Sequence, residues 1–300
     1  MSERYPRVRI DSSLGEKRYL CIRESVSITF YMKRSHQEVV HQVMRALEVY
    51  RRAVGPQVLL WYYDQYSDDW EELNDKGWAH LRRQLLEERA AHHWLSASPS
   101  ETTGYDFHYE GLLLEAYEGD PASAMSFLLP TEYLEEHGPG RVRELALALA
   151  AELPFNSGHA GLCFHAPTAL VGVTRRIRDL CFRYPGMDIA DLHCTSLGTR
   201  VDGVHWLNFL GPPVLGELGG TAGLRARLHS PGTTVQDLDG GRALVTLDTW
   251  PEAGDMEQGH TLPAYRELVR VLEPWLHMQR ACWGGFSEED MRRWERRFLD

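Results

Sequence analysis

Hydrophobic residues at helical spacing predict a helix near the N-terminus, with a strand on either side of it. The apolar positions that recur three or four residues apart along this helix are Val39, Val40, Val43, Met44, Leu47, Tyr50 and Val54. Ser35 and Glu38 have the spacing of a capping box, and Gly55-Pro56 is a stop signal. Residues 27–33 alternate as in a strand, and the continuous apolar run at 57–63 predicts a buried strand. The order strand, helix, strand is that of a crossover connection.

Strands and helices continue to interleave along the rest of the chain, but short hairpins are mixed among them. Apolar residues predict paired strands at 105–117 and 122–129 around a turn at 118–121. The other predicted elements are a helix at 141–153, a strand at 160–165, a helix ending near 184, strands at 204–210 and 243–250, and helices beginning at Pro263 and Ser287. This mixture favours an α+β fold, with a mixed, largely antiparallel sheet and packed helices, over a doubly wound parallel sheet.

A length of 300 residues allows one large domain or two small ones. Residues 1–26 are charged and weakly periodic, so we interpret them as an N-terminal arm with at most one edge strand. Residues 27–300 then form a single α+β domain. The segment 96–104 has the Ser-, Thr- and Gly-rich composition of a linker, and it marks the place where two lobes could meet.

The chain carries more acidic than basic residues. There are 43 Asp and Glu against 32 Lys and Arg, which gives a formal net charge of -11. This balance argues against generic binding to duplex nucleic acid, where a basic face must neutralise phosphates, and it favours a basic protein partner. No apolar run reaches the ~18 residues of a membrane helix, and the N-terminus lacks the apolar segment of a signal peptide. We therefore expect a cytoplasmic protein without a membrane partner.

The cysteines indicate neither a disulfide framework nor a structural zinc site. Their number is odd, and none forms a Cys-x-x-Cys pair. Most lie among apolar residues, which is typical of small core side chains. They are Cys21, Cys163, Cys181, Cys194 and Cys282.

The sequence motifs of several enzyme classes are missing. There is no Gly-x-x-x-x-Gly-Lys-Ser/Thr phosphate loop, no Gly-x-Gly-x-x-Gly after a strand and no Gly-x-Ser-x-Gly nucleophile elbow. His92 and His93 are adjacent on a predicted helix, so they would point to different faces and chelate a metal poorly. His193 and Cys194 are sequence neighbours, which seldom form a working base and nucleophile. We therefore expect no catalytic residues, no metal site and no cofactor.

One short segment combines carboxylates with aromatic rings. It contains Asp64, Asp68, Asp69, Glu71 and Glu72, interleaved with Tyr62, Tyr63, Tyr66 and Trp70. We predict a loop that leads into a helix, and two interpretations stay open. Either the acids belong to a solvated loop and a favourable helix N-terminus, or aromatic rings anchor a partner whose approach the charge steers. A second acidic stretch contains Asp248, Glu252, Asp255 and Glu257.

The C-terminal half contains a more distinctive set of motifs. They are Tyr184-Pro185-Gly186-Met187-Asp188, Gly203-Val204-His205-Trp206-Leu207-Asn208-Phe209-Leu210, Leu218-Gly219-Gly220, Pro251-Glu252-Ala253-Gly254-Asp255 and the segment 294–298. Together they resemble the type VI secretion immunity protein family of proteobacteria, long catalogued as a domain of unknown function. The resemblance runs from about residue 28 to the end of the chain.

This resemblance implies a cytoplasmic antidote that binds and neutralises a cognate secreted toxin, often a nuclease, without catalysing a reaction. An acidic protein suits a basic nuclease, whose substrate-binding surface it could occupy. The candidate toxin contacts are then the two acidic stretches, namely Asp64, Tyr66, Asp68, Asp69, Trp70, Glu71, Glu72, Asp248, Asp255 and Glu257. Trp206, Phe209, Gly219 and Gly220 would instead maintain the fold. Two alternatives stay open: a hydrolase-like enzyme with His, Asp or Glu in a cleft between lobes, and a scaffold or self-associating protein. The oligomeric state stays undetermined.

Overall fold

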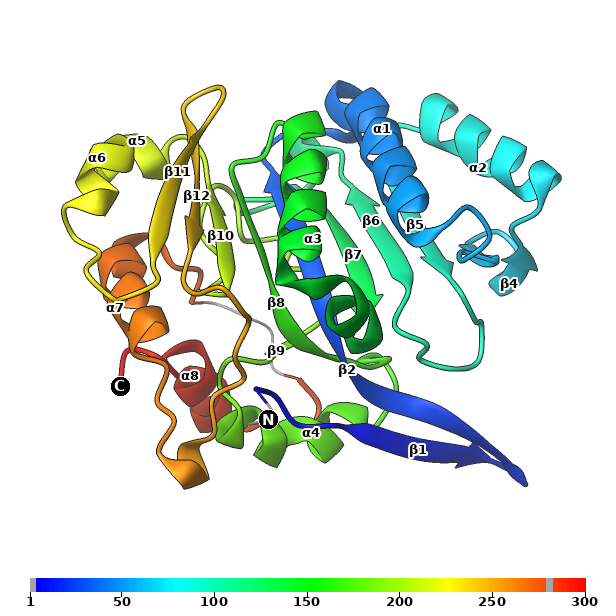
Figure 1. Ribbon diagram of the computed structural model, residues 1–300. Coiled ribbons are helices and arrows are strands. Elements are labelled where there is room, and N and C mark those ends of the chain that lie inside the picture. The colour runs from blue at the N-terminus through cyan, green and yellow to red at the C-terminus, as the bar shows by residue number, and fades with distance from the viewer. Residues whose placement is uncertain (1–3, 279–282) are drawn as a thin grey trace.

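The computed structural model describes residues 4–278 and 283–300, and its main feature is one large β-sheet (Figure 1). Twelve strands of the described residues belong to this sheet. In chain order they are β1 (Arg9–Leu14), β2 (Lys17–Met32), β3 (Trp61–Asp64), β4 (Asp69–Glu72), β5 (Ala91–Ser96), β6 (Asp106–Gly111), β7 (Ser123–Pro130), β8 (Ser157–His165), β9 (Asp188–Ile189), β10 (Leu207–Leu210), β11 (Thr234–Leu238) and β12 (Arg242–Thr246).

The order of the strands across the sheet is β11-β12-β10-β8-β2-β7-β6-β5-β3-β4, with β1 paired to β2 and β9 paired to β8. Among the described strands, only the pair β8 and β9 is parallel. This confirms the predicted α+β fold with a largely antiparallel sheet. Four antiparallel steps separate β2 from β3, so these two strands run in the same direction. The helix between them is therefore the expected crossover, and it passes over the strands that lie between them.

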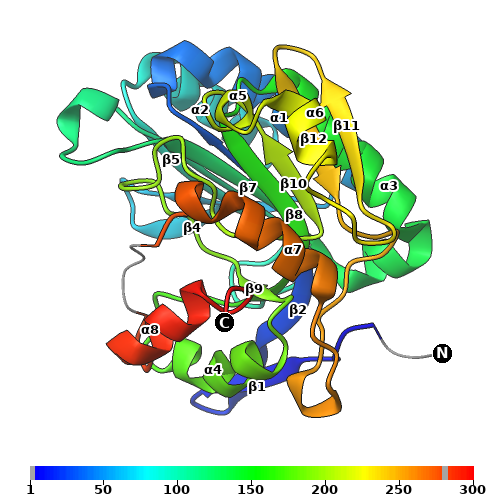
Figure 2. The same ribbon diagram turned by 90° about the vertical axis from the view of Figure 1, so that its left-hand side faces the viewer.

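Eight α-helices of the described residues accompany the sheet. They are α1 (His36–Val54), α2 (Asp75–Glu87), α3 (Thr131–Glu152), α4 (Val173–Arg183), α5 (Val214–Glu217), α6 (Gly220–Arg225), α7 (Pro263–Leu272) and α8 (Glu288–Glu295). Short 3-10 turns occur at Leu114–Ala116, Met256–Gln258 and Glu273–Trp275. Helices α1, α2 and α3 lie on one face of the sheet (Figure 1), whereas α7 lies on the opposite side from α3 (Figure 2).

The helix starts that depend on local signals are confirmed. Ser35 and Glu38 form both halves of the capping box of α1. Pro263 occupies the first turn of α7, and Ser287 begins α8 with a second capping box. Helix α3 begins at Thr131 rather than at residue 141, because an earlier helical segment joins it across a kink at Gly138.

The N-terminal region differs most from the prediction. β2 begins at Lys17 and is buried from Cys21 to Met32, so the boundary predicted at residue 26 falls inside a central strand. Residues 1–26 are therefore not a separate arm. The apolar pattern is interrupted because Glu24 is fully buried within the strand. Its carboxylate accepts the backbone N–H of Val8 and pairs with nearby arginines, which compensates the cost of burying the charge.

Other differences concern strands with exposed residues and the predicted lobe boundary. β3 begins at Trp61 and is only partly buried, whereas a buried strand was expected over 57–63. β11 has no predicted counterpart because most of its side chains are exposed, which removes the apolar signal. The segment 96–104 joins β5 to β6, and these two strands pair with each other over six residues. The predicted lobe boundary therefore lies between two paired strands of one sheet.

Two hydrophobic clusters pack on opposite faces of the sheet. In β12, Leu244 belongs to the cluster beneath α1 and α3, whereas its neighbours Ala243 and Val245 belong to the cluster that includes α7. Trp206 and Phe209 are 1% and 0% exposed, and the Trp206 indole N–H donates to the backbone oxygen of Asp248 at 2.7 Å. Gly219 and Gly220 adopt positive φ angles of 82° and 69° where α5 turns into α6.

Candidate partner-binding surface

The acidic, aromatic segment forms a β-hairpin rather than the predicted loop. β3 and β4 pair in register, with Tyr63 opposite Trp70 and Asp64 opposite Asp69. The Asp64 carboxylate accepts the N–H of Tyr66 at 3.1 Å, and Asp68 has a φ of 56°, so two acids fix the turn. β4 was missed because it has no buried residue to create an alternating pattern.

The acids of this hairpin are not the N-terminus of the following helix. Asn74 caps α2, and its side-chain oxygen accepts the N–H groups of Lys76 and Gly77. β4 is instead the last strand of the sheet, as Figure 1 shows at the right-hand side. Charged side chains on an edge strand hinder pairing with the strand of another molecule. The hairpin therefore presents its charges to solvent at an end of the sheet.

The negative charge of the hairpin is not neutralised by neighbouring bases. In the part of the chain that the structure describes, none of its five carboxylates lies within 4.0 Å of a Lys, Arg or His nitrogen. Their hydrogen-bond partners are neutral groups: the Tyr63 hydroxyl for Asp68, a backbone N–H for Asp69 and the Asn74 amide for Glu72. Tyr66, at the turn, is 79% exposed. This arrangement presents uncompensated charge beside an exposed ring.

A row of aromatic rings continues from the hairpin across β5 and β6. The Trp70 ring contacts Tyr63 with centroids 5.8 Å apart and Trp94 with centroids 5.2 Å apart. Trp94 stacks on His108 at 5.9 Å with an interplanar angle of 26°. These residues are half-buried, and the strand register places them on the sheet face opposite Tyr62 and Leu95. Of the hairpin carboxylates, Glu72 shares this face, and the others lie beside it at the edge of the sheet. We call the aromatic row, together with these carboxylates, the acidic-aromatic surface.

His92 and His93 lie on β5, not on the predicted helix. They still point to opposite faces, because successive side chains alternate along a strand. His93 is 3% exposed, and burial lowers its pKa to about 3. His92 lies on the acidic-aromatic surface, where its Nδ1 and the Nε2 of His108 both contact Glu110. Although burial raises the pKa of Glu110, the hydrogen bonds from His108 and His92 lower it to about 2.

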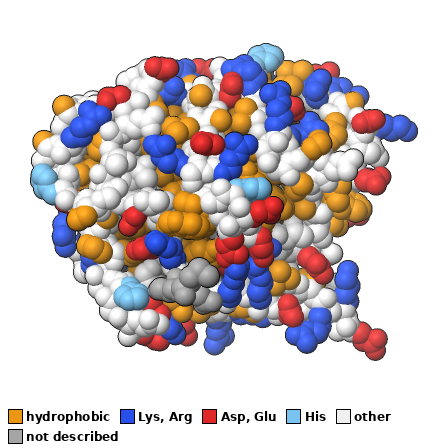
Figure 3. All heavy atoms as spheres, in the orientation of Figure 1, with side chains coloured by type: hydrophobic (Ala, Val, Ile, Leu, Met, Phe, Trp, Pro, Cys, Tyr) orange, Lys and Arg blue, Asp and Glu red, His pale blue; other side chains and the backbone are white. Residues whose placement is uncertain are grey.

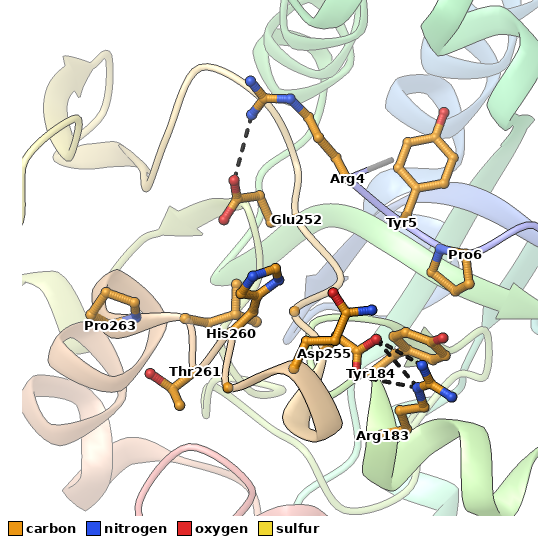
Figure 4. Close-up of a pocket in the computed structure, with 14 residues that line it drawn as sticks. Arg4, Tyr5, Pro6, Arg183, Tyr184, Glu252, Asp255, His260, Thr261 and Pro263 are labelled. Atoms are coloured by element: carbon orange, nitrogen blue, oxygen red, sulfur yellow. Dashed lines mark hydrogen bonds and ion pairs between the residues drawn. The ribbon is translucent and has the colours of Figure 1, made fainter. Parts of the chain in front are cut away.

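The second acidic stretch has a different environment. Asp255 is 6% exposed, and two of its oxygens accept from the Arg183 guanidinium, with the closest contact at 2.9 Å. Arg183 also pairs with Glu257 at 2.8 Å. Hydrogen bonding to Arg183 lowers the pKa of Asp255. Arg183 and Asp255 border a cavity of about 670 Å³, in which Arg4 pairs with Glu252 (Figure 4). Arginines of the same chain therefore compensate the negative charges of Glu252, Asp255 and Glu257.

The two acidic stretches do not come together in space. The second stretch follows β12, whereas the hairpin contains β4, and these strands lie near opposite ends of the sheet (Figure 1). The Asp248 carboxylate accepts its neighbour's backbone N–H, and its carbonyl oxygen holds the Trp206 indole. The structure thus separates one exposed, uncompensated group of acids from another in which Glu252, Asp255 and Glu257 form internal ion pairs.

A buried polar cluster was missed by the sequence reasoning. His205 Nε2 lies 2.7 Å from Asp188 Oδ2, and the His205 ring stacks on His159 at a centroid distance of 3.7 Å. All three are at most 7% exposed. Asp188 and His205 belong to the distinctive motifs at 184–188 and 203–210, which was the available signal. The cluster joins β8, which carries His159, to β9, which carries Asp188, and to the segment before β10, which carries His205. Its His–Asp pair is shielded from solvent.

The neighbouring thiol and imidazole do not form a nucleophile and base. Cys194 is buried, and burial raises the pKa of its thiol well above the ordinary value. His193 Nε2 is directed to Asp202, 3.9 Å from its carboxylate. The thiols of Cys21, Cys163 and Cys181 are also free and buried, while Cys282 lies outside the described residues.

Two observations concern nucleic acid and membrane, the partners that the sequence disfavours. On the face drawn in Figure 3, Lys and Arg side chains are interspersed with Asp and Glu and do not gather into one basic field. In the described ranges, no helix is both long enough and apolar enough to cross a membrane. The mixed charge does not favour a phosphate backbone as the ligand of the face shown.

Comparisons with known proteins gave a family match and a structural match. A family model described as "TsiV: Type VI immunity for VRR-NUC" matches residues 42–298. A solved structure of a T6SS protein from Pseudomonas aeruginosa aligns with a TM-score of 0.78 and 18% identity, covering 97% of this chain and 87% of that one. At this identity the alignment shows a shared fold. The comparison with curated proteins gave no match.

Proposed function

The chain belongs to the TsiV family, the type VI immunity proteins for VRR-NUC nucleases, and we propose that it binds its toxin through the acidic-aromatic surface. This surface consists of the β3–β4 hairpin and the half-buried rings of β5 and β6. An immunity protein for a nuclease must block an enzyme whose substrate is a polyanion. A surface that carries negative charge resembles that substrate electrostatically, so it can occupy the basic groove where nucleic acid binds.

The observation that supports this proposal is the uncompensated charge of the hairpin beside half-exposed aromatic rings. Charge of this kind accelerates association with a basic partner, whereas rings such as Trp70 fill pockets and slow dissociation. The second stretch carries similar residue types, but Asp255 and Glu257 are engaged with Arg183. Binding a toxin there would first require these ion pairs to be given up. The hairpin is therefore the favoured contact.

Inhibition on this proposal is stoichiometric and not enzymatic. The close His–Asp pairs of the described residues, His205 with Asp188 and His165 with Asp106, are buried among core residues. We further propose that the protein acts in the cytoplasm, where a nuclease meets its nucleic acid. Titrating the nuclease with this protein should abolish cleavage at one equivalent. Inactivation by far less than one equivalent would instead favour the enzyme hypothesis.

The contact can be tested by surface plasmon resonance with the cognate VRR-NUC nuclease over a salt series. Asp69→Lys with Glu72→Lys should slow association, by about 10-fold or more at low salt, and the defect should shrink as salt screens exposed charges beyond ~8 Å. The matched control is Glu144→Lys with Asp239→Lys, which makes the same change of charge at exposed positions outside the surface. Equal defects in both double variants would indicate an effect of net charge alone.

The aromatic contribution needs a separate comparison. Trp70→Ala should speed dissociation by about 30-fold, which corresponds to about 2 kcal/mol for an anchor residue. Trp250→Ala removes a half-buried indole that follows β12, near the other end of the sheet, and should leave the rates unchanged. A loss confined to Trp250→Ala would move the contact to the second acidic stretch and refute the proposal.

A further inference from the structure

We propose that His92, His108 and Glu110 form a binding site for a divalent transition-metal ion of the zinc class. One potential ligand atom from each residue lies within 4.8 Å of those of the other two. The sequence reasoning expected no metal site because it considered His92 only together with His93. The site combines His92 of β5 with two residues of β6. It does not depend on the proposed toxin contact.

The strand register brings the three side chains together. His92 on β5 stands directly opposite Glu110 on β6, and His108 precedes Glu110 by two residues on the same face. β6 pairs with β5 on one side and with β7 on the other at both His108 and Glu110, and β5 pairs with β3 at Leu95 and Ser96. Backbone hydrogen bonds therefore hold the ligand-bearing positions, and only side-chain rotations remain to be fixed on binding.

The donor set and its spacing suit a tetrahedral ion. Two imidazole nitrogens and one carboxylate oxygen are ligands that zinc accepts, and with bonds of about 2.1 Å two such ligands lie about 3.4 Å apart. His108 Nε2 is 3.1 Å from Glu110 Oε1, and His92 Nδ1 contacts the same oxygen. Small rotations would open this hydrogen-bonded triad to the spacing that an ion requires. Imidazole ligands favour such an ion over magnesium or calcium.

The surroundings position the rings and leave a path from solvent. The side chains of His92, His108 and Glu110 are 36%, 29% and 24% exposed, so an ion can enter and a fourth ligand can come from water. Trp94 stacks on His108 and directs its indole N–H to Asp106 at 3.4 Å, which restricts the imidazole on one side. The two imidazoles stand at 86° to each other with centroids 5.1 Å apart.

Calorimetric titration of the full chain with Zn²⁺ alone tests the site. We expect one ion per chain, and His108→Gln or Glu110→Gln should weaken binding by at least ~10-fold, the loss that even outer-shell partners of a metal can cause. His137→Gln, at an exposed histidine of α3, is the matched control and should bind as the unaltered chain does. Absence of binding at millimolar zinc, or equal affinity in all variants, would overturn the assignment.

A second measurement does not rely on substituted chains folding correctly. In long-range ¹H–¹⁵N spectra of the unaltered protein, the ring nitrogens of His92 and His108 should shift together on zinc addition while those of His137 stay in place. Shifts confined to other histidines would place the ion elsewhere and refute the site. The toxin takes no part in either assay, so a negative result leaves the proposed function untouched.

Discussion

Replacing Trp206 by Ala should lower the free energy of unfolding by about 3–5 kcal/mol, the range for removing a large aromatic side chain from a core. The side chain is 1% exposed, and an indole buries roughly 150–250 Å², which at ~25 cal/mol per Å² gives about 4–6 kcal/mol as an upper bound. Its N–H also donates to the carbonyl oxygen of Asp248 at 2.7 Å, a bond that contributes about 1 kcal/mol. The backbone oxygen of Trp206 in turn accepts the N–H of Leu247, so this residue joins the start of β10 to the end of β12.

The measurement is urea unfolding followed by far-ultraviolet circular dichroism, since nine tryptophans make the fluorescence signal composite. Trp206→Phe is the matched control. It retains most of the apolar contact and loses the indole N–H, so it should cost about 1–2 kcal/mol.

Two outcomes would refute this reasoning. A loss below ~1 kcal/mol for Trp206→Ala would mean that the ring is not part of the core, because cavity formation alone exceeds that value. Equal losses for the Ala and Phe variants would place the cost in the hydrogen bond to Asp248 and not in packing.

Three further predictions concern the fold and the proposal that the protein acts without catalysis. Gly186→Ala should destabilise the fold by about 1–3 kcal/mol, because the added Cβ would lie 2.2 Å from the Glu252 backbone oxygen. The Cβ of Gly216→Ala would meet no atom within 4 Å, so thermal melts should show this variant to be as stable as the unaltered protein or more so. Burial lowers the pKa of His36 below 6.5, so the unfolded chain takes up a proton at a higher pH than the folded chain does. The free energy of unfolding should therefore fall as pH drops from about 7.5 to 5.5. If His36→Gln leaves this pH dependence undiminished, His36 is not its source. His193→Ala and Cys194→Ala should retain full inhibition of the nuclease, and loss of inhibition with the fold intact would revive an enzymatic role.

The sequence by itself determined the elements whose signals are local. The capping boxes at Ser35 and Ser287 and the proline at 263 mark where helices begin, because they satisfy or avoid backbone N–H groups within a single turn. Hairpins among helices were enough to predict the α+β class. The motifs at 184–188 and 203–210 carried the resemblance to the immunity family, and the net charge of -11 already disfavoured nucleic acid as a ligand.

Only the tertiary structure decided features that depend on contacts between distant residues. β2 extends back to Lys17 because its first residues pair with β1. Its buried Glu24 is tolerated because Arg7 and Arg9 pair with it, a compensation that no local pattern reveals. Asp255 and the hairpin acids are the same kind of residue in the sequence, yet Arg183 reaches only the former. Partner choice of this kind is fixed by the packing of elements far apart in the chain.

The same distinction applies to the acidic-aromatic surface and the proposed metal site. His92 and Glu110 are separated by a loop of linker-like composition, and nothing in their spacing suggests proximity. They meet because β5 and β6 pair in one particular register, and a shift of that register by one residue would turn each side chain to the other face. The sequence supplied the charged and aromatic residues of this surface, and strand pairing decided which of them share a face.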